Sequence, residues 1–216
     1  MDKVDLALII ALDCSASVTF DEFGLMAGGC GAALRDKEVQ AGLTGGPLGA
    51  SLCALLLWSG HNAHEVSVDW TRVASAAQLE QFASDVENTP RLVPAGATAI
   101  GEALLACEAM LAVLPASARR QVIDVAGDGR SNDGARPEPV RDRLVAAGVT
   151  INGLCVLHEE ADLLASYTSE VIGGPAAFAL QCQDYAGFTA AMQQKLQREI
   201  ATAPANHHAG SEQRPA

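Results

Sequence analysis

The feature that most constrains this chain is a nearly unbroken apolar run close to its N-terminus, Val4–Leu12, which leads directly into the motif DCSAS at residues 13–17. A strand that is apolar at consecutive positions is buried on both faces, as in the parallel sheets of α/β proteins. The motif places one carboxylate and two hydroxyls at the end of this strand. Because hard divalent cations prefer such oxygen ligands, we expect a metal site at the rim of a covered sheet.

The rest of the chain alternates between strand and helix patterns, which indicates one α/β fold: a doubly wound, mostly parallel, six-stranded sheet with helices on both faces. The connection Trp58–Glu65 is short enough for a hairpin, so strand three is expected to be an antiparallel edge. The six expected strands are Val4–Leu12, Ala54–Trp58, Val66–Trp70, Val122–Ala126, Thr150–Leu157 and Ala177–Leu180.

Apolar residues at helical spacing predict six helices between and after these strands. The first is the best signalled, because Thr19 and Glu22 form a capping box ahead of an apolar face that runs to Leu34. The others are marked by Leu79–Val86, Ile100–Leu114, Val140–Ala147, Leu163–Val171 and Tyr185–Glu199.

Length and composition predict one domain over residues 1–200, followed by a disordered tail at 201–216. The chain has 216 residues, of which 49% are hydrophobic, enough for a single large core. Its net charge of −12 and the lack of a basic stripe argue against nucleic-acid binding. No apolar run approaches the ~20 residues that cross a bilayer, so membrane insertion is not expected.

The six cysteines form no C-x-x-C pair and lie mostly in segments expected to be buried, so we interpret them as free thiols in a reducing compartment. This favours a cytoplasmic location. The first apolar run is interpreted as a strand because acidic residues flank it on both sides, unlike an export signal. An exported protein whose upstream leader is missing is the alternative.

Three separated motifs occur in a fixed order: DCSAS at 13–17, GATAIG at 96–101 and GDG at 127–129. With them the chain resembles a von Willebrand factor type A (vWA) domain over nearly all of residues 4–200. Together with the later NGL and IGGP stretches, the GDG motif resembles a bacterial subgroup of stand-alone vWA-like domains of unknown function. The resemblance implies the Rossmann-like strand order 3-2-1-4-5-6. It also implies a metal ion-dependent adhesion site (MIDAS) formed by Asp13, Ser15, Ser17, Thr98 and Asp128.

Two carboxylates and three neutral hydroxyls balance one divalent cation, and a ligand set made only of oxygens favours Mg²⁺ or Mn²⁺ over Zn²⁺. We expect an Asp or Glu of an unknown partner protein to fill an open position on this metal, so that the chain acts as an interaction module. No catalytic residue and no organic cofactor are assigned, and no oligomeric state is predicted. The alternatives are a Mg²⁺-dependent hydrolase or phosphoesterase and a metal-free scaffold domain.

Other polar residues have simpler interpretations. Asp133 is expected to be a solvated loop carboxylate rather than a residue that tunes the metal, and His61 and His64 to lie in an exposed loop. Cys14 is expected to pack into the core. Asp124 falls in the middle of a buried strand, where an unpaired carboxylate is costly, so it needs a structural partner. We predict Asn152 on the neighbouring strand, or a backbone amide, for that role.

Overall fold

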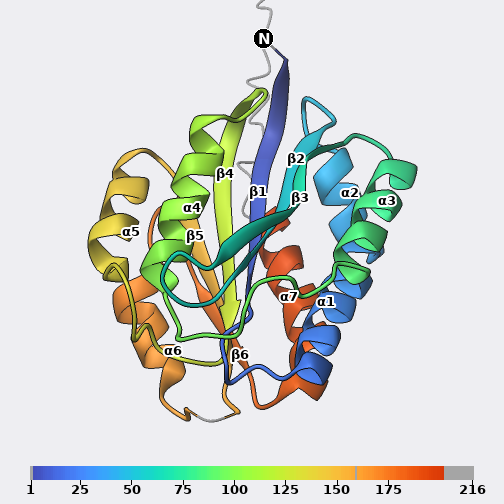
Figure 1. Ribbon diagram of the computed structural model, residues 1–216. Helices are drawn as coiled ribbons and strands as arrows, with labels where there is room; N and C mark the ends of the chain where they lie inside the picture. Colours follow the sequence, from blue (N-terminus) through green and yellow to red (C-terminus); the bar gives the residue numbers. More distant parts are fainter. Residues whose placement is uncertain (1, 159, 202–216) are drawn as a thin grey trace, which may run out of the picture.

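The computed structural model describes residues 2–158 and 160–201 and contains one six-stranded sheet with helices on both faces (Figure 1). The strand order is β3-β2-β1-β4-β5-β6, and every neighbouring pair is parallel except β2 with β3. The predicted sheet order and the antiparallel third strand are therefore confirmed. The strands are β1 (Lys3–Asp13), β2 (Ser51–Trp58), β3 (His64–Val73), β4 (Ser117–Gly127), β5 (Thr150–Val156) and β6 (Ala179–Cys182).

The two faces of the central strand β1 contact different helix layers, because successive side chains of a strand point to opposite faces. Leu8 and Ile10 belong to the larger core cluster, whereas Ile9 and Ala11 belong to a second cluster on the other face. Both layers therefore hold β1 away from water along nearly its whole length, as its nearly unbroken apolar sequence predicts.

Within the described residues, four α-helices cover one face of the sheet and three cover the other (Figure 1). The larger layer contains α1 (Phe20–Leu34), α2 (Lys37–Thr44), α3 (Ala76–Glu87) and α7 (Phe188–Ala201). The smaller layer contains α4 (Ile100–Ala112), α5 (Pro137–Ala146) and the short α6 (Leu163–Ser166), which continues as a π-helical segment over Tyr167–Val171.

The structure differs from the prediction in one helix and in the start of one strand. Helix α2 was not predicted, because its eight residues bury only two side chains, Val39 and Leu43, and give little helical periodicity. Strand β4 begins at Ser117 rather than at Val122, since its first residues are polar but still pair with β1. The capping box of Thr19 and Glu22 is present as predicted.

All six cysteines are buried and free, as predicted. In the part of the chain that the structure describes, none of the helices combines the length and hydrophobicity that a bilayer crossing requires. The tail predicted for 201–216 lies outside the described residues except for Ala201, which ends α7.

Candidate metal centre

The first motif begins where β1 ends. Asp13 is the last residue of the strand and is fully buried, and Cys14 still donates from its backbone amide to the Trp58 carbonyl at 2.7 Å. The chain then turns, because the Ser15 amide donates to Asp13 Oδ1 at 2.6 Å. This short-range bond fixes the carboxylate at the rim and brings both serine hydroxyls beside it.

The third motif meets the first across the β1–β4 junction. Asp128 directly follows β4, which pairs with β1, and its side chain is only 1% exposed. Ser17 Oγ donates to Asp128 Oδ1 at 2.7 Å, and Ser15 Oγ lies 3.1 Å from Ser17 Oγ. A chain of oxygen atoms therefore links residues more than 100 positions apart in the sequence.

Thr98 reaches the same rim through the loop between α3 and α4. The Ala16 amide donates to the Gly96 carbonyl at 2.8 Å, which joins this loop to the first motif. The Asn132 side-chain oxygen accepts a bond from the Thr98 backbone amide at 2.9 Å. The Asn132 backbone amide donates to the Thr98 carbonyl at 2.8 Å. An added Cβ on Gly129, the residue after Asp128, would lie 3.4 Å from Thr98 Oγ1. The fold thus brings together all five residues that the vWA resemblance selects.

In the described part of the chain, no cationic side chain forms an ion pair with the two carboxylates at this rim. Burial raises the pKa of Asp13 to about 7, and the nearby charge of Asp128 adds to the effect. Asp13 Oδ2 is buried, and among the described residues no donor reaches it. Arg91 is close by, but its guanidinium donates to the carbonyls of Cys14, Ser15 and Val18. Two buried carboxylates without a cationic side chain are costly, so they fit a bound cation.

The backbone of β4 lies very close to this unpartnered oxygen. A Cβ on Gly127 would lie 2.7 Å from Asp13 Oδ2 and 2.9 Å from the Tyr167 hydroxyl, closer than side-chain atoms pack. Only glycine therefore lets β4 approach Asp13 so closely. With oxygen ligands, an orphaned carboxylate oxygen and a glycine at the point of contact, the residues present suit a hard divalent ion.

Two tyrosines beside the site were not predicted. The Tyr185 hydroxyl donates to Asp128 Oδ2 at 2.8 Å, so each oxygen of this carboxylate accepts one bond from the chain. The Tyr167 side chain is fully buried near Asp13, its hydroxyl has no partner among the described residues, and burial raises its pKa well above the usual value. The sequence gives no signal for these roles, because both residues also fit the apolar helix faces on which they lie.

The remaining rim residues follow the simpler interpretations only in part. His61 and His64 are exposed, as expected, but only His61 lies in the hairpin loop, because His64 is the first residue of β3 and pairs with Trp58. Asp133 is half-buried, and it accepts a bond from the His61 backbone amide at 2.8 Å, so it ties the β2–β3 hairpin to the β4 loop. Cys14 is fully buried in the core cluster, and burial raises its pKa to about 12. Within residues 2–158 and 160–201, no three His, Cys, Asp or Glu side chains gather as metal ligands.

A second buried polar cluster lies inside the molecule, between the sheet and α7. Asp124 forms an ion pair with Lys195, and both side chains are fully buried. Glu199, one helical turn further along α7, is 2% exposed, and burial together with the charge of Asp124 raises its pKa well above the usual value. The predicted structural partner of Asp124 therefore exists, but its predicted identity was wrong. Asn152 instead donates to Glu199 Oε2, at 3.4 Å.

Comparison with solved structures defines the class of fold. Proximal thread matrix protein 1 from the mussel byssus, in a structure with a zinc-occupied MIDAS motif, has a TM-score of 0.65 at 19% identity; the match covers 91% of this chain and 46% of that one. The vWF domain of the type V pili tip protein Mfa5 from Porphyromonas gingivalis has a TM-score of 0.65 at 11% identity, covering 94% and 97%. A von Willebrand factor type A protein from Catenulispora acidiphila has a TM-score of 0.58 at 15% identity, covering 93% and 43%.

The chain thus has the same fold as these von Willebrand factor type A domains, and it spans about half the length of the mussel protein. It belongs to the family described as "Protein of unknown function (DUF1194)", which matches residues 3–204. None of the curated proteins matches this chain in sequence.

Proposed function

We propose that this chain is a metal-dependent protein-interaction module, in which Asp13, Ser15, Ser17, Thr98 and Asp128 hold a divalent cation. The observation that carries this proposal is the pair of buried carboxylates at the rim: among residues 2–158 and 160–201, no cationic side chain forms an ion pair with them and no donor reaches Asp13 Oδ2. The zinc-occupied MIDAS motif of the mussel protein supports a cation at the corresponding rim. Because all five candidate ligands are oxygens, we propose Mg²⁺ or Mn²⁺ for this chain.

A bound cation would supply positive charge and a coordination position for an acidic side chain from outside. The protein residues prepare that position in two ways. Two carboxylates neutralise a divalent ion, while the three hydroxyls add ligands without adding charge, so an incoming carboxylate is not repelled by a third acid. Asp128 is held by both Ser17 and Tyr185, so it need not reorient when the partner arrives.

The surface beside the metal loop suggests what else the partner contacts. Phe20 is 75% exposed at the start of α1, and Leu92 is 62% exposed on the loop that carries Thr98. The Arg91 guanidinium lies 4.9 Å from the centre of the Phe20 ring and donates to the backbone of the metal loop. We propose that the partner presents an acidic residue next to apolar ones, because exposed apolar side chains at a binding rim gain from being covered.

Hydrolysis is the weaker proposal. Among the described residues, no lysine or histidine side chain forms a hydrogen bond or ion pair with the five site residues, so a general acid or base of these two types does not accompany the carboxylates. A binding role needs only the cation and its vacant position, and this is why we favour it.

Affinity capture with the immobilised protein tests the proposal. We expect a partner that is retained in Mg²⁺, released by EDTA and lost with Asp13→Ala. Asp21→Ala is the matched control, because Asp21 is an exposed carboxylate in the first turn of α1 and should leave capture unchanged. Phe20→Ser should weaken capture, whereas Val113→Ser, at a residue 73% exposed outside the metal loop, should not. Capture that is insensitive to both EDTA and Asp13→Ala would contradict the proposal.

A further inference from the structure

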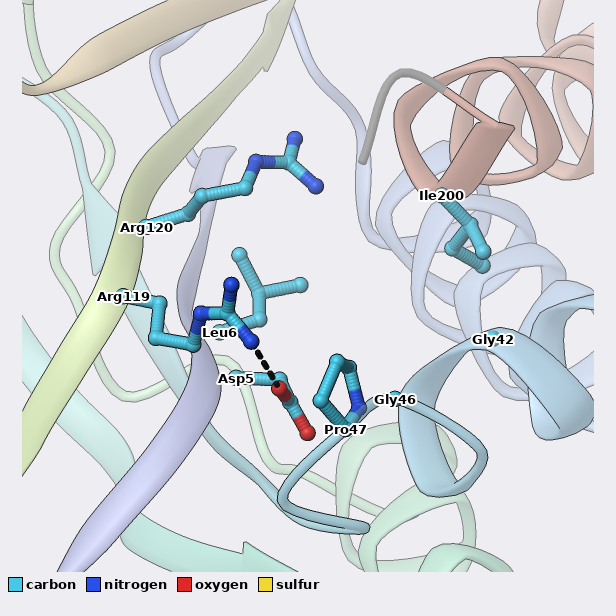
Figure 2. Close-up of a pocket in the computed structure, with 8 residues that line it drawn as sticks. All are labelled: Asp5, Leu6, Gly42, Gly46, Pro47, Arg119, Arg120 and Ile200. Carbon is cyan, nitrogen blue, oxygen red and sulfur yellow. Dashed lines mark ion pairs between the residues drawn. The ribbon is translucent and has the colours of Figure 1, made fainter. Parts of the chain in front are cut away.

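Strand β1 carries an acidic residue near each of its ends, and the two acids have different neighbours. Asp5, near the start of the strand, forms an ion pair with Arg119, whose Nη1 lies 3.9 Å from Asp5 Oδ1 (Figure 2). At Asp13, the last residue of the strand, the neighbouring side chain is that of Tyr167, which carries a neutral hydroxyl in place of a guanidinium. This hydroxyl has no role in the metal site as described above.

Two distances from one point place the Tyr167 hydroxyl next to Asp13. A Cβ on Gly127 would lie 2.7 Å from Asp13 Oδ2 and 2.9 Å from the hydroxyl oxygen, so both oxygens lie close together on the same side of the β4 backbone. Both are buried, and among the described residues neither has a hydrogen-bond partner. A buried donor without an acceptor thus lies beside a buried acceptor without a donor.

Two glycines and an unusual helical turn hold the tyrosine in this place. A Cβ on Gly153 of β5 would lie 2.8 Å from Tyr167 Cδ1, so the ring lies directly on the β5 backbone, as its hydroxyl lies on β4 at Gly127. Tyr167 begins the π-helical segment, and its carbonyl accepts a bond from the Ile172 amide at 2.9 Å. Glycine weakens a strand, and π-helical turns are rare and occur frequently at functional sites. The position of this side chain is therefore fixed at a cost to both the sheet and the helix.

Packing alone does not account for the hydroxyl group. A phenylalanine would fill nearly the same space, whereas a buried hydroxyl without a partner costs free energy because it has lost its hydrogen bonds to water. Burial raises the pKa of Tyr167 well above its usual value, and nearby negative charge, that of Asp13 included, adds to the effect. The hydroxyl therefore keeps its proton and is a donor.

We propose that Tyr167 is a positioning residue of the metal site: when Asp13 holds the cation, the Tyr167 hydroxyl donates to Asp13 Oδ2. This inference rests on the proposed function, because it assigns a donor to one of the candidate ligands. Asp128 already has the matching arrangement, since Tyr185 donates to its Oδ2 at 2.8 Å. A carboxylate oxygen has two lone pairs, so the bond from Tyr167 leaves the carboxylate able to bind a metal. Such bonds to metal ligands fix their orientation and strengthen metal binding.

Calorimetric titration of Mg²⁺ into Tyr167→Phe tests the assignment. We expect the affinity to be about tenfold lower than that of the wild type. The melting temperature in EDTA should not fall, in contrast to Tyr185→Phe, because no hydrogen bond of the metal-free protein is lost. Ser166→Ala is the matched control: it removes a buried hydroxyl from the preceding residue, which lies 3.4 Å from Glu170 Oε2, and should leave the Mg²⁺ affinity unchanged.

Tyrosine vibrational spectroscopy separates a new hydrogen bond from an effect on packing. The chain contains two tyrosines, so Tyr185→Phe leaves Tyr167 as the single reporter. In this variant, saturating Mg²⁺ should shift the hydroxyl-sensitive tyrosine bands in the direction of a donating hydroxyl. Adding Asp13→Asn should abolish the shift.

The contrary outcomes are distinct. Equal Mg²⁺ affinity of Tyr167→Phe and the wild type, or tyrosine bands that do not respond to saturating Mg²⁺, would overturn the role of Tyr167 and leave the metal site in place. A melting temperature of Tyr167→Phe that falls as much in EDTA as in Mg²⁺ would show that the hydroxyl serves the fold alone. A wild type that binds no Mg²⁺ would overturn the proposed function itself, and this inference with it.

Discussion

Two buried acidic clusters in this molecule are neutralised in different ways. Inside, between β4 and α7, the carboxylate of Asp124 meets the ammonium of Lys195, and the chain supplies its own cation. At the rim, Asp13 and Asp128 are equally buried, but the described residues that reach them are hydroxyls and backbone amides. Both clusters include an acid that lies on β4 or directly after it. They differ mainly in the groups that contact the acids: an ammonium inside, and hydroxyls and backbone amides at the rim.

This difference explains why the interior cluster is structural and why the rim cluster suits the binding of a cation. An ion pair enclosed by packed helices has no reason to exchange with solvent, and it joins α7 to the sheet. A pair of acids at a sheet rim, without an internal cation, gains stability when a cation enters from outside. We therefore expect the two clusters to respond oppositely to mutation and to metal, and the following changes test that expectation.

The largest effect should come from Lys195→Met, which leaves Asp124 buried without its cation. We expect the free energy of unfolding to fall by about 3–5 kcal/mol, measured by urea denaturation. Added Mg²⁺ should not restore it, because the interior cluster is closed to solvent. The double variant Asp124→Leu/Lys195→Met should recover much of the loss. A single variant that costs less than 1 kcal/mol would show that the ion pair does not anchor α7.

The same Asp→Asn change should act differently in the two clusters. Asp124→Asn leaves Lys195 without its counter-charge and should lower the free energy of unfolding by about 3 kcal/mol. Asp13→Asn in EDTA should leave stability unchanged or raise it, because it removes a buried charge next to Asp128. Thermal melts with and without Mg²⁺ separate the cases: wild type and Asp124→Asn should be stabilised by the metal, and Asp13→Asn should not. If Asp13→Asn and Asp124→Asn lowered stability equally in EDTA, the proposed difference between the two clusters would be contradicted.

Gly127→Ala tests how closely the rim is packed. The new methyl group would lie 2.7 Å from Asp13 Oδ2, so the carboxylate must shift, and we expect a loss of about 1–3 kcal/mol together with weakened metal binding. Gly28→Ala on α1 is the control, since nothing lies within 4 Å of its Cβ position. It should raise stability by up to about 1 kcal/mol through helix propensity. Unchanged metal affinity in Gly127→Ala would argue against Asp13 as a ligand.

Tyr185→Phe should have the smallest effect. The change removes one donor to Asp128 and should lower stability by about 1 kcal/mol. Removing a hydrogen bond to a metal ligand typically costs about tenfold in affinity, which titration of Mg²⁺ into the variant would measure. Tyr167→Phe provides the comparison, because the Tyr167 hydroxyl has no donor or acceptor among the described residues. If Tyr185→Phe binds metal like wild type, the tyrosine serves packing alone.

The sheet and the rim could be predicted from the sequence because their signals are local and ordered. The buried run Val4–Leu12 predicts a central strand, and the short Trp58–Glu65 connection predicts the antiparallel edge. The strand order and the five rim residues came from the resemblance to vWA domains, not from periodicity. The fold brings those five residues together, and their binding of a metal stays a prediction.

The interior cluster was missed for a physical reason. Two ionisable residues of α7, Lys195 and Glu199, lie on its apolar face, which also carries Phe188 and Met192. This placement was the one sequence signal that could have indicated a buried polar cluster. Sequence spacing alone cannot tell whether such residues reach solvent at the helix edge or lie under it. The partner of Asp124 depends on how α7 docks across the sheet. Similarly, the bond from Tyr185 to Asp128 depends on where the turn before α7 meets the rim.

Calorimetric titration of the metal-free protein with Mg²⁺ and Mn²⁺, in parallel with Asp13→Asn and Asp21→Asn, tests the central claim most directly. We predict one ion per chain for wild type and Asp21→Asn, and no detectable binding for Asp13→Asn. Equal binding by Asp13→Asn, or no binding by the wild type, would contradict the conclusion that the rim carboxylates are neutralised by an external cation.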